Sequence, residues 1–399
     1  MEKSMEKEWL YETAGTVLGE AIGLRRELHR RPELSFRERE TAERIARMLD
    51  GAGIPYRRVA GTGLLARVEG MAEGDACVVL RADIDALPVM EETGLEYASE
   101  NPGVMHACGH DIHAACLMGT LLGLQRNRDR FGGAVLGLFQ PGEETHPGGA
   151  SLVLREGVLD GLYPVAVIGQ HVAPELPTGT FGFRSGMYMA SGDEIHITLR
   201  GTGGHGGLPH TLTDPVLAAA QLIVSLQQVV SRFVPAEIPA VLSFGKIVAD
   251  GATNVIPAEV YLAGTLRMMS EQWRAKAKKR IREIAEGVAA AYGVTAEVDI
   301  RDGYPNVVND AEVTERVKRV AEVLVGRERV SELGLRMTAE DFGFYTQRFR
   351  SVFYRLGVGF PDGRKTGGLH TSTFVADEEA MVHGIALMTG AALECLRNG

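Results

Sequence analysis

One window of the sequence carries more side chains able to bind a metal ion than any other. Between Met105 and His113 it contains three histidines, one cysteine and one aspartate. Imidazole, thiolate and carboxylate groups are the common protein ligands of divalent first-row metals. The apolar residues that follow recur at helical spacing, so Cys108 and His110 should lie on a loop just before a helix, with Asp111 near its start. A buried helix start with a structural cysteine is the plainer alternative.

Glu143 and Glu144 are the second candidate for chemistry. They follow the apolar run Ala134–Phe139 and the turn-forming pair Pro141–Gly142. Neighbours on a straight strand point to opposite faces, so both carboxylates can reach one site only if the chain turns there. One carboxylate could then bind metal while the other moves protons, because a divalent ion lowers the pKa of a bound water. A solvated acidic loop tip is the alternative.

His171 and His370 are the remaining candidate ligands. His171 directly follows an apolar run, where a histidine is more often a core residue that donates to a carbonyl. His370 follows a flexible, glycine-containing approach. With Cys108, His110 and Glu144 they make five donors of mixed softness, too many for one tetrahedral ion and suited to two ions that share a bridge. Cys108 or an acidic residue could be that bridge.

Other polar residues near these donors have expected supporting roles. Arg81, Asp83 and Asp85 flank the site and should orient the ligand imidazoles through hydrogen bonds, with a salt bridge at the strand end as the alternative. Three further histidines are not expected to bind metal directly: His106, His113 and His146.

The elements that must position these side chains are those of an α/β protein. Short apolar runs, typical of strands buried on both faces, are separated by helical or loop sequence and indicate a largely parallel, helix-covered sheet. Acidic or imidazole groups follow all four of these runs, at the sheet edge where ligands of open α/β sheets collect. The runs are Cys77–Ala82, Ala134–Phe139, Val165–Gly169 and Ser351–Gly357.

The middle of the chain predicts a second domain. Residues 189–301 follow the order β-α-β-β-α-β, the split βαβ pattern of ferredoxin-like folds. We expect them to be inserted into a metal-binding domain made of residues 1–188 and 302–399. The glycine-rich stretch around His205 lacks the helix and acidic residue that a dinucleotide site needs, and it better suits a tip that reaches into a cleft. Arg267 could grip a carboxylate there or form a surface ion pair.

Length and composition limit the function classes. The chain has 399 residues, which favours two domains, and its net charge of −10 argues against nucleic acid or an anionic membrane as a partner. The N-terminus lacks an apolar signal core, and no run of about 18 apolar residues predicts a transmembrane helix. Four cysteines without a C-x-x-C pair fit a reducing cytoplasm. Serine hydrolases of the elbow type and helix-based zinc proteases are excluded, because neither G-x-S-x-G nor H-E-x-x-H occurs.

Taken together, these motifs resemble those of the di-metal amidohydrolases that include hippurate hydrolase, N-acyl-amino-acid amidohydrolases and auxin-conjugate hydrolases. The resemblance runs through nearly the whole chain. The motifs that carry it are Leu28–Ser35, Arg81–Pro88, Met105–Asp111, Phe139–Glu144, Gly204–His210, Asn254–Pro257, Glu340–Phe342 and Leu369–His370. One departure is Gly206–Gly207, where many relatives have alanine, and it would loosen the loop around His205.

The resemblance implies a metallo-exopeptidase-like fold, an inserted lid domain and a set of site residues. The implied metal ligands, with Cys108 as the bridge, are Cys108, His110, Glu144, His171 and His370. Glu143 is implied as general base and acid. His205 is implied to reach the active site of a partner subunit in a homodimer that forms through the lid. Asn254 and Arg267 are suggested as contacts of the substrate carboxylate.

The implied reaction is hydrolysis of the amide bond of an N-acyl amino acid, of the N-acetyl or N-benzoyl type. The cofactors would be two divalent ions, manganese or zinc, with cobalt as a further option. Three alternatives stay open at this point. They are a dipeptidase or carboxypeptidase with the same core, a catalytically silent binding protein, and a thiol-based redox sensor that acts through Cys108.

Overall fold

The computed structural model describes residues 2–397, which form two compact units. Unit 1 contains the chain up to Gly186, together with Val308–Gly334 and the chain from Phe344 onward. Unit 2 contains Met187–Val307 and Leu335–Gly343. The strands β7 (Gly186–Met189) and β14 (Val307–Asn309) lie where the chain passes from one unit to the other.

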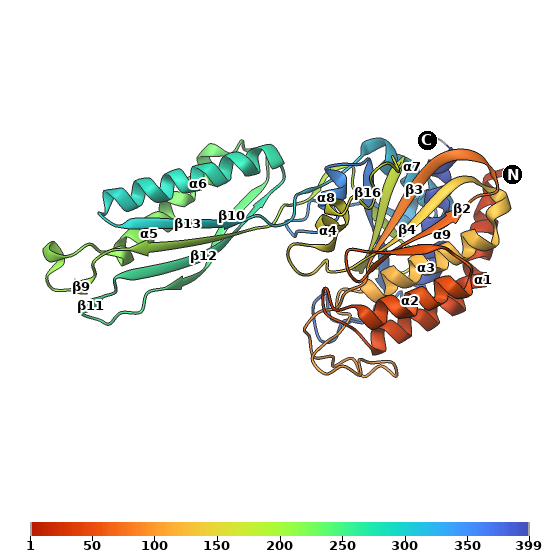
Figure 1. Cartoon of the computed structure of the whole chain (residues 1–399), viewed down its shortest axis with the longest axis horizontal. Helices are drawn as coiled ribbons and strands as arrows, with labels where there is room; N and C mark the ends of the chain where they lie inside the picture. The colour runs from red at the N-terminus through yellow and green to blue at the C-terminus, as the bar shows by residue number, and fades with distance from the viewer. Residues whose placement is uncertain (1, 398–399) are drawn as a thin grey trace. The chain divides into compact units, whose positions relative to one another are not determined.

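An eight-stranded sheet forms the middle of unit 1 (Figure 1), in the order β1-β2-β4-β3-β5-β16-β6-β15. Its strands are β1 (Tyr56–Val59), β2 (Gly63–Glu69), β3 (Ala72–Asp83), β4 (Gly132–Gln140), β5 (Ala166–Pro177), β6 (Phe181–Phe183), β15 (Val330–Glu332) and β16 (Ser351–Gly359). The four central strands, β4, β3, β5 and β16, are parallel. The predicted α/β class with a largely parallel sheet is therefore confirmed.

Helices cover one face of this sheet with apolar side chains. The helices whose side chains belong to this core are α1 (Glu2–Arg30), α2 (Arg39–Gly51), α3 (His110–Arg126), α7 (Ala311–Val325) and α9 (Ala380–Arg397). The shorter elements are α4 (Gly149–Arg155), α8 (Gly343–Thr346) and the turns η1 (Arg128–Arg130) and η4 (Arg327–Arg329). Helix α8 lies by the other face of the sheet, where its Tyr345 hydroxyl donates to Gln140. Helices α3 and α9 pack on the strands, and α1 lies against both (Figure 1). Alternate residues of β3, such as Val78 and Leu80, belong to the core beneath these helices. Arg81 and Asp83 alternate with them and therefore point to the opposite face.

The spacing of Ala42, Ile45, Ala46 and Leu49 predicts a helix from about Phe36, but α2 begins only at Arg39. Phe36 has a φ of 62°, a left-handed conformation that a helix cannot contain. Its backbone N–H donates to the Glu38 carboxylate at 2.9 Å, so the chain makes a tight turn before the helix starts.

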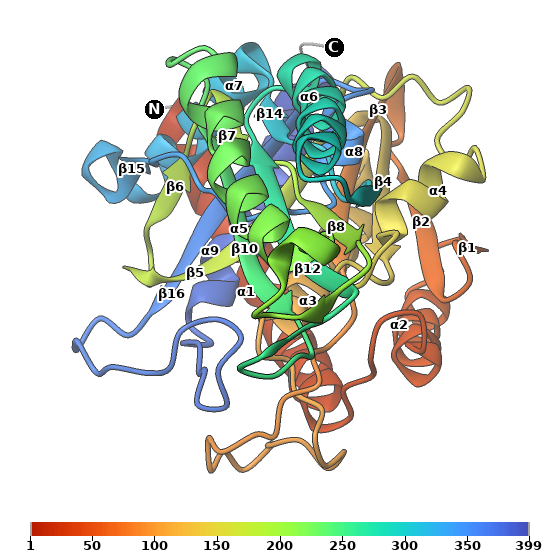
Figure 2. The same ribbon diagram turned by 90° about the vertical axis from the view of Figure 1, so that its left-hand side faces the viewer.

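Unit 2 has a four-stranded antiparallel sheet in the order β10-β12-β8-β13. Its elements are β8 (Asp193–Arg200), β9 (Gly204–His205), η2 (Pro209–Thr211), α5 (Pro215–Leu226), the π-helical turn η3 (Val229–Phe233), β10 (Ala240–Val248), β11 (Val255–Ile256), β12 (Glu259–Met268), α6 (Glu271–Ala291) and β13 (Thr295–Arg301). Helices α5 and α6 lie side by side along one face of the sheet (Figure 2). Asp214 caps α5 through the amides of Val216 and Leu217, and Pro215 occupies its first turn. This element order is the ferredoxin-like one that the sequence pattern predicts.

Among the residues that the structure describes, one segment is long and apolar enough to cross a membrane by length and composition, Pro215–Phe233. It comprises α5 and η3, and it is not an unbroken apolar run, because Gln221, Gln227 and Arg232 interrupt it. Its inner face, with Ala218 and Leu222, belongs to the core of unit 2. On its outer face Leu217 and Val224 are 55% and 67% exposed.

Candidate metal centre

The register of the parallel strands in unit 1 brings polar side chains to one level of the sheet. Asp83 of β3 lies opposite Gln140 of β4, and Arg81 lies opposite Gly169 of β5, so His171 is level with Asp83. Strand β5 continues beyond His171 because it pairs with the long strand β16. His171 therefore lies within a strand and not after it, yet it lies at the carboxyl edge of its shorter neighbours, where ligands of α/β sheets collect.

The start of α3 brings a thiol to the same edge. Gly109, just before the helix, has a φ of 80°, and a Cβ added there would lie 2.6 Å from the side chain of Val172. Glycine thus allows this loop to approach β5 closely. As a result the Cys108 Sγ lies 3.4 Å from His171 Nε2, and His110 occupies the first position of α3.

His370 approaches the same sulfur from the loop that follows β16. Its Nε2 atom is 3.3 Å from Cys108 Sγ and 3.3 Å from Glu144 Oε1. The backbone of His370 has a φ of 65°, which is uncommon for a residue other than glycine, and its N–H donates to the carbonyl of Ala107 at 2.8 Å. Strained backbone conformations of this kind cluster at functional sites.

The two adjacent glutamates turn toward the same point. Gly142, with a φ of 60°, makes the turn that follows β4. Glu144 Oε1 is 3.8 Å from His110 Nε2, and a carboxylate oxygen of Glu143 lies within 4.8 Å of both groups. The Glu143 side chain is only 7% exposed, so its carboxylate is held inside the site and not at a solvated loop tip.

Three overlapping groups of possible ligand atoms consist only of the predicted ligands and Glu143, and Cys108 belongs to two of these three. The groups are Cys108–His110–His171, Cys108–Glu144–His370 and His110–Glu143–Glu144.

Two atoms of these groups, His110 Nε2 and Glu144 Oε1, are buried and have no hydrogen-bond partner among the described residues. Burying a polar atom without a partner costs free energy, so these atoms call for a partner that the chain does not supply. A divalent cation is such a partner, and the mixture of thiol, imidazole and carboxylate fits two of them.

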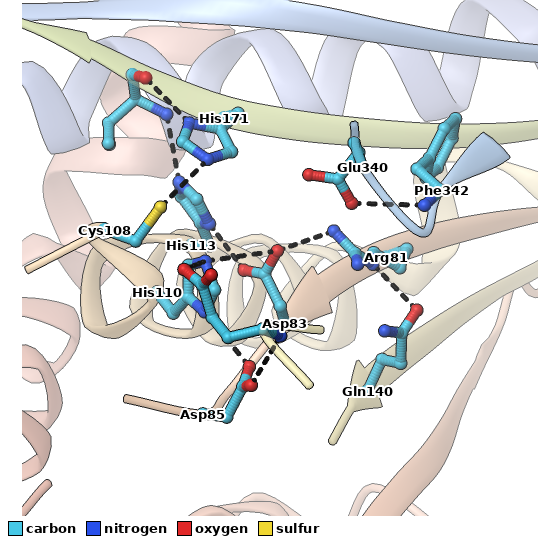
Figure 3. Close-up of polar contacts among 12 residues, drawn as sticks. Arg81, Asp83, Asp85, Cys108, His110, His113, Gln140, His171, Glu340 and Phe342 are labelled. Atoms are coloured by element: carbon cyan, nitrogen blue, oxygen red, sulfur yellow. Dashed lines mark hydrogen bonds and ion pairs between the residues drawn. The ribbon is translucent and has the colours of Figure 1, made fainter. Parts of the chain in front are cut away.

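Outer hydrogen bonds determine which nitrogen of each imidazole faces these groups (Figure 3). His110 Nδ1 donates to Asp85 Oδ1 at 3.1 Å, and His171 Nδ1 donates to the carbonyl of Val172 at 2.8 Å. The Nε2 atom of each ring is therefore unprotonated in the neutral form, and its lone pair is available to a metal. Asp85 also accepts the N–H of Glu144 at 2.9 Å, so it connects two of the candidate ligands.

His113 forms a further group of close donor atoms with Asp83 and His110, but it is not free to ligate. Its Nδ1 donates to Asp83 Oδ1 at 2.6 Å, and its Nε2 accepts the N–H of Val172 at 2.9 Å, so both ring nitrogens are used (Figure 3). Asp83 in turn accepts from the Arg81 guanidinium at 2.6 Å. His113 therefore links Asp83 to the backbone of β5 next to His171.

The other metal-capable residues of the motif lie outside the groups of close donors. His106 is buried and His146 is exposed, and neither belongs to such a group among the described residues. Asp111 points to α1, where it accepts from Arg25 Nε and His29 Nδ1, each at 2.8 Å. This buried pairing ties the start of α3 to α1. The sequence reasoning did not identify it, although His29 belongs to the motif Leu28–Ser35.

Protons and metal ions compete for the same atoms in this site. Burial alone would lower the pKa of His110, but Asp83 and Cys108 outweigh it and raise that pKa well above its usual value. The hydrogen bond to Cys108 and the nearby Glu144 carboxylate raise the pKa of His370 to about 10. Burial, with the Glu144 charge, raises the pKa of the Cys108 thiol, while burial lowers the pKa of His171 well below its usual value. Binding of a divalent cation must therefore release protons.

The three site residues predicted in the middle of the chain, His205, Asn254 and Arg267, all lie in unit 2. His205 pairs with Val255, the residue after Asn254, so these side chains belong to one exposed tip. Arg267 lies near the other end of β12, and the strand from Glu259 to Arg267 spans about 26 Å. Asn254 and Arg267 of one chain therefore cannot contact the same small carboxylate.

Comparisons with known proteins relate the whole chain to hydrolases. Residues 79–394 match the family described as peptidase family M20/M25/M40. The chain is 40% identical to N-acetyl-L-cysteine deacetylase of Bacillus subtilis over 368 residues, which cover 92% of this chain and 86% of that protein. It is 38% identical to N-acetyldiaminopimelate deacetylase of Exiguobacterium sibiricum, with coverage of 92% and 97%. The crystal structure of a Bacillus subtilis protein described as a dinuclear metal-binding peptidase of family M20 superimposes with a TM-score of 0.82, at 34% identity and coverage of 96% and 99%.

Proposed function

The chain belongs to peptidase family M20/M25/M40, and we propose that it is a metal-dependent amidohydrolase that cleaves the amide bond of N-acyl amino acids. The observation that carries this function is the pair of buried, unpartnered atoms His110 Nε2 and Glu144 Oε1 beside the buried carboxylate of Glu143. Relatives named as deacetylases of N-acetylcysteine and N-acetyldiaminopimelate support the substrate class. The products would be a carboxylic acid and a free amino acid.

Two divalent cations are the cofactors, and we assign them to Cys108 as the shared ligand, with the other four donors distributed around it. Those four donors are His110, Glu144, His171 and His370. The thiol and imidazoles favour zinc, while the Glu144 carboxylate also suits manganese or cobalt. When bound, the cations would polarise the acyl carbonyl and make the attacking water more acidic.

Glu143 would carry the proton between the two bonds that change. Its carboxylate accepts a proton from the attacking water and later gives that proton to the nitrogen of the departing amine. A carboxylate suits this task here because it is largely shielded from bulk water and lies next to the candidate ligand Glu144.

We propose that the protein forms a homodimer through unit 2, which acts as the lid. Strand β10 is an edge of the unit 2 sheet and exposes Val241, Ile247 and Val248, while Leu217 and Val224 are exposed on α5. An exposed apolar edge strand pairs readily with another chain, and a second copy in antiparallel register would cover this one. The turn η3, which follows α5, contacts β10, so the end of this helix and the edge strand lie on the same side of unit 2.

A dimer would also resolve the separation of the proposed substrate contacts. His205 and Asn254 at the tip would enter the active site of the partner, where His205 stabilises the developing oxyanion. Arg267 would grip the substrate carboxylate, and it need not lie beside Asn254 of the same chain. Each site would then depend on residues of both subunits.

Mixing two inactive variants tests this arrangement. A heterodimer of Glu143→Gln and His205→Ala subunits has one site with both intact residues, so random exchange should restore about a quarter of wild-type kcat. Each variant alone should stay inactive, and a mixture of Glu143→Gln with a Glu143→Gln, His205→Ala double variant is the control. Activity of the first mixture no higher than that of the control would refute a shared site.

A substrate panel tests the proposed reaction itself. Metal-stripped protein would be reloaded with zinc, manganese or cobalt and assayed on N-acetyl amino acids, N-benzoyl amino acids and dipeptides. We expect the highest kcat/KM on an N-acyl amino acid. A preference for dipeptides would instead identify a dipeptidase or carboxypeptidase. No turnover of any compound with any metal would support the alternative of a catalytically silent binding protein.

The four free cysteines suit a reducing compartment, and we propose a cytoplasmic location.

A further inference from the structure

Glu38, in the turn before α2, contacts the loop that carries the two site glutamates. Its side chain is fully buried, and its Oε1 atom accepts the N–H of Gly142 at 2.8 Å. The same oxygen accepts the N–H of Phe36 at 2.9 Å, and Oε2 accepts the hydroxyl of Thr62 at 2.6 Å. None of these groups is a candidate metal ligand, and the reaction described above gives Glu38 no task.

The loop is held on both sides of Glu143. On one side, Glu38 accepts the N–H of Gly142, and on the other side Asp85 accepts the N–H of Glu144 at 2.9 Å. Asp85 is itself held by Ser35, whose hydroxyl donates to it at 2.7 Å. Two buried carboxylates thus fix the amides that directly precede and follow the residue proposed as general base.

Packing supports the same geometry. A Cβ added at Gly142 would lie 2.2 Å from the ring of Phe36, so the turn at Gly142 and the turn at Phe36 fit together only without a side chain at position 142. Phe36 has a left-handed φ of 62°, and the bond from its N–H to Glu38 holds it there. Burying a carboxylate costs several kcal/mol unless donors compensate it, and here three donors converge on one group.

We propose that Glu38 is a positioning residue for Glu143: it holds the loop so that the Glu143 carboxylate meets the attacking water at the right distance. The inference rests on the proposed function, because it takes Glu143 as the base. It assigns a task to the segment from Ser35 to Glu38, which connects the first two helices and otherwise lacks a role in the reaction. A displacement of about 1 Å in a catalytic group can lower the rate about 100-fold, so loss of this contact should reduce kcat strongly.

The test compares three variants in the metal-loaded enzyme. Glu38→Met keeps the length of the side chain and removes the acceptors, so kcat should fall about 10- to 100-fold while KM changes less than about twofold and two metal ions per chain remain. Glu38→Gln keeps an oxygen for the two amides, and its NH₂ group can donate to Thr62, so it should stay within about threefold of wild type. Glu40→Met is the matched control, because Glu40 lies two residues after Glu38, in the first turn of α2, and its side chain is 68% exposed.

Hydrogen exchange of the segment 140–148 gives a second readout that does not depend on turnover. The Gly142 amide should exchange faster in Glu38→Met than in wild type or Glu38→Gln. If Glu38→Met fails to fold, Thr62→Val, which removes one donor to Glu38, should show the same changes on a smaller scale.

Equal kcat and equal exchange in Glu38→Met and wild type would overturn the inference while leaving the proposed function intact. Loss of metal or a rise in KM that accounts for the whole defect would overturn it as well. A fully active Glu143→Gln enzyme would instead show that the proposed function is wrong, and the positioning role would fall with it.

Discussion

Replacing Glu143 with glutamine should lower kcat for N-acyl amino acid hydrolysis by about 1000-fold and leave KM nearly unchanged. Glutamine has almost the same shape but cannot accept a proton from the attacking water. The loss corresponds to about 4 kcal/mol of transition-state stabilisation. The hydrogen bonds that hold the loop, from Gly142 to Glu38 and from Glu144 to Asp85, involve backbone amides and remain in the variant. Steady-state kinetics on the best substrate of the panel measure the effect.

Metal content separates this chemical defect from a structural one. The Glu143→Gln protein should still bind two divalent ions per chain, because the five proposed ligands are untouched. Glu12→Gln, an exposed position on α1, is the control and should retain wild-type kcat. A Glu143→Gln enzyme that is as fast as this control would remove Glu143 from the mechanism.

Replacing Cys108 with alanine should have the second large effect, the loss of metal. Cys108 Sγ is within 3.4 Å of both His171 Nε2 and His370 Nε2, and no other residue belongs to both of those donor groups. Changing residues that only support a ligand already weakens metal binding about 10- to 100-fold, so loss of a ligand shared by two ions should weaken it more than about 100-fold. Activity should fall to the level of chelator-treated wild type.

Metal analysis after dialysis, with reloading by zinc, manganese or cobalt, measures this prediction. Cys77→Ala is the matched control, because its sulfur donates to the carbonyl of Leu162 and belongs to none of the donor groups found in the described part of the chain. A Cys108→Ala protein that retains two ions and full activity would refute the bridging role. Activity of wild type that survives a strong chelator would revive the alternative of thiol-based redox chemistry.

Much of the fold can be predicted from the sequence because its signals are local. The apolar runs of β3, β4, β5 and β16 are continuous, as strands buried on both faces must be, and the polar residues after them mark one edge of the sheet. The length of β5 is not predictable in this way. Pairing with β16 extends the strand past His171, and no feature of the apolar run Val165–Gly169 indicates this extension. Likewise, the late start of α2 depends on the turn at Phe36, which a contact with Glu38 maintains.

The parts of the site that cannot be predicted from the sequence are contacts between residues far apart in the chain. Asp111 looks like a metal ligand by type and spacing, but its partners Arg25 and His29 lie more than 80 positions earlier. Glu38 carries no pattern that would connect it with Gly142, 104 positions later. By contrast, the separation of Asn254 and Arg267 is predictable, since the strand segment from Glu259 to Arg267 already spans too great a distance for one small carboxylate.

Anomalous diffraction from crystals of the metal-loaded protein tests the central claim most directly. With data collected at the absorption edge of the loaded ion, we expect two peaks, both about 2.3 Å from the Cys108 sulfur if the ions are zinc. One peak should lie next to His171 and the other next to His370. A single peak, or peaks remote from Cys108, would contradict a two-metal centre built from these five residues.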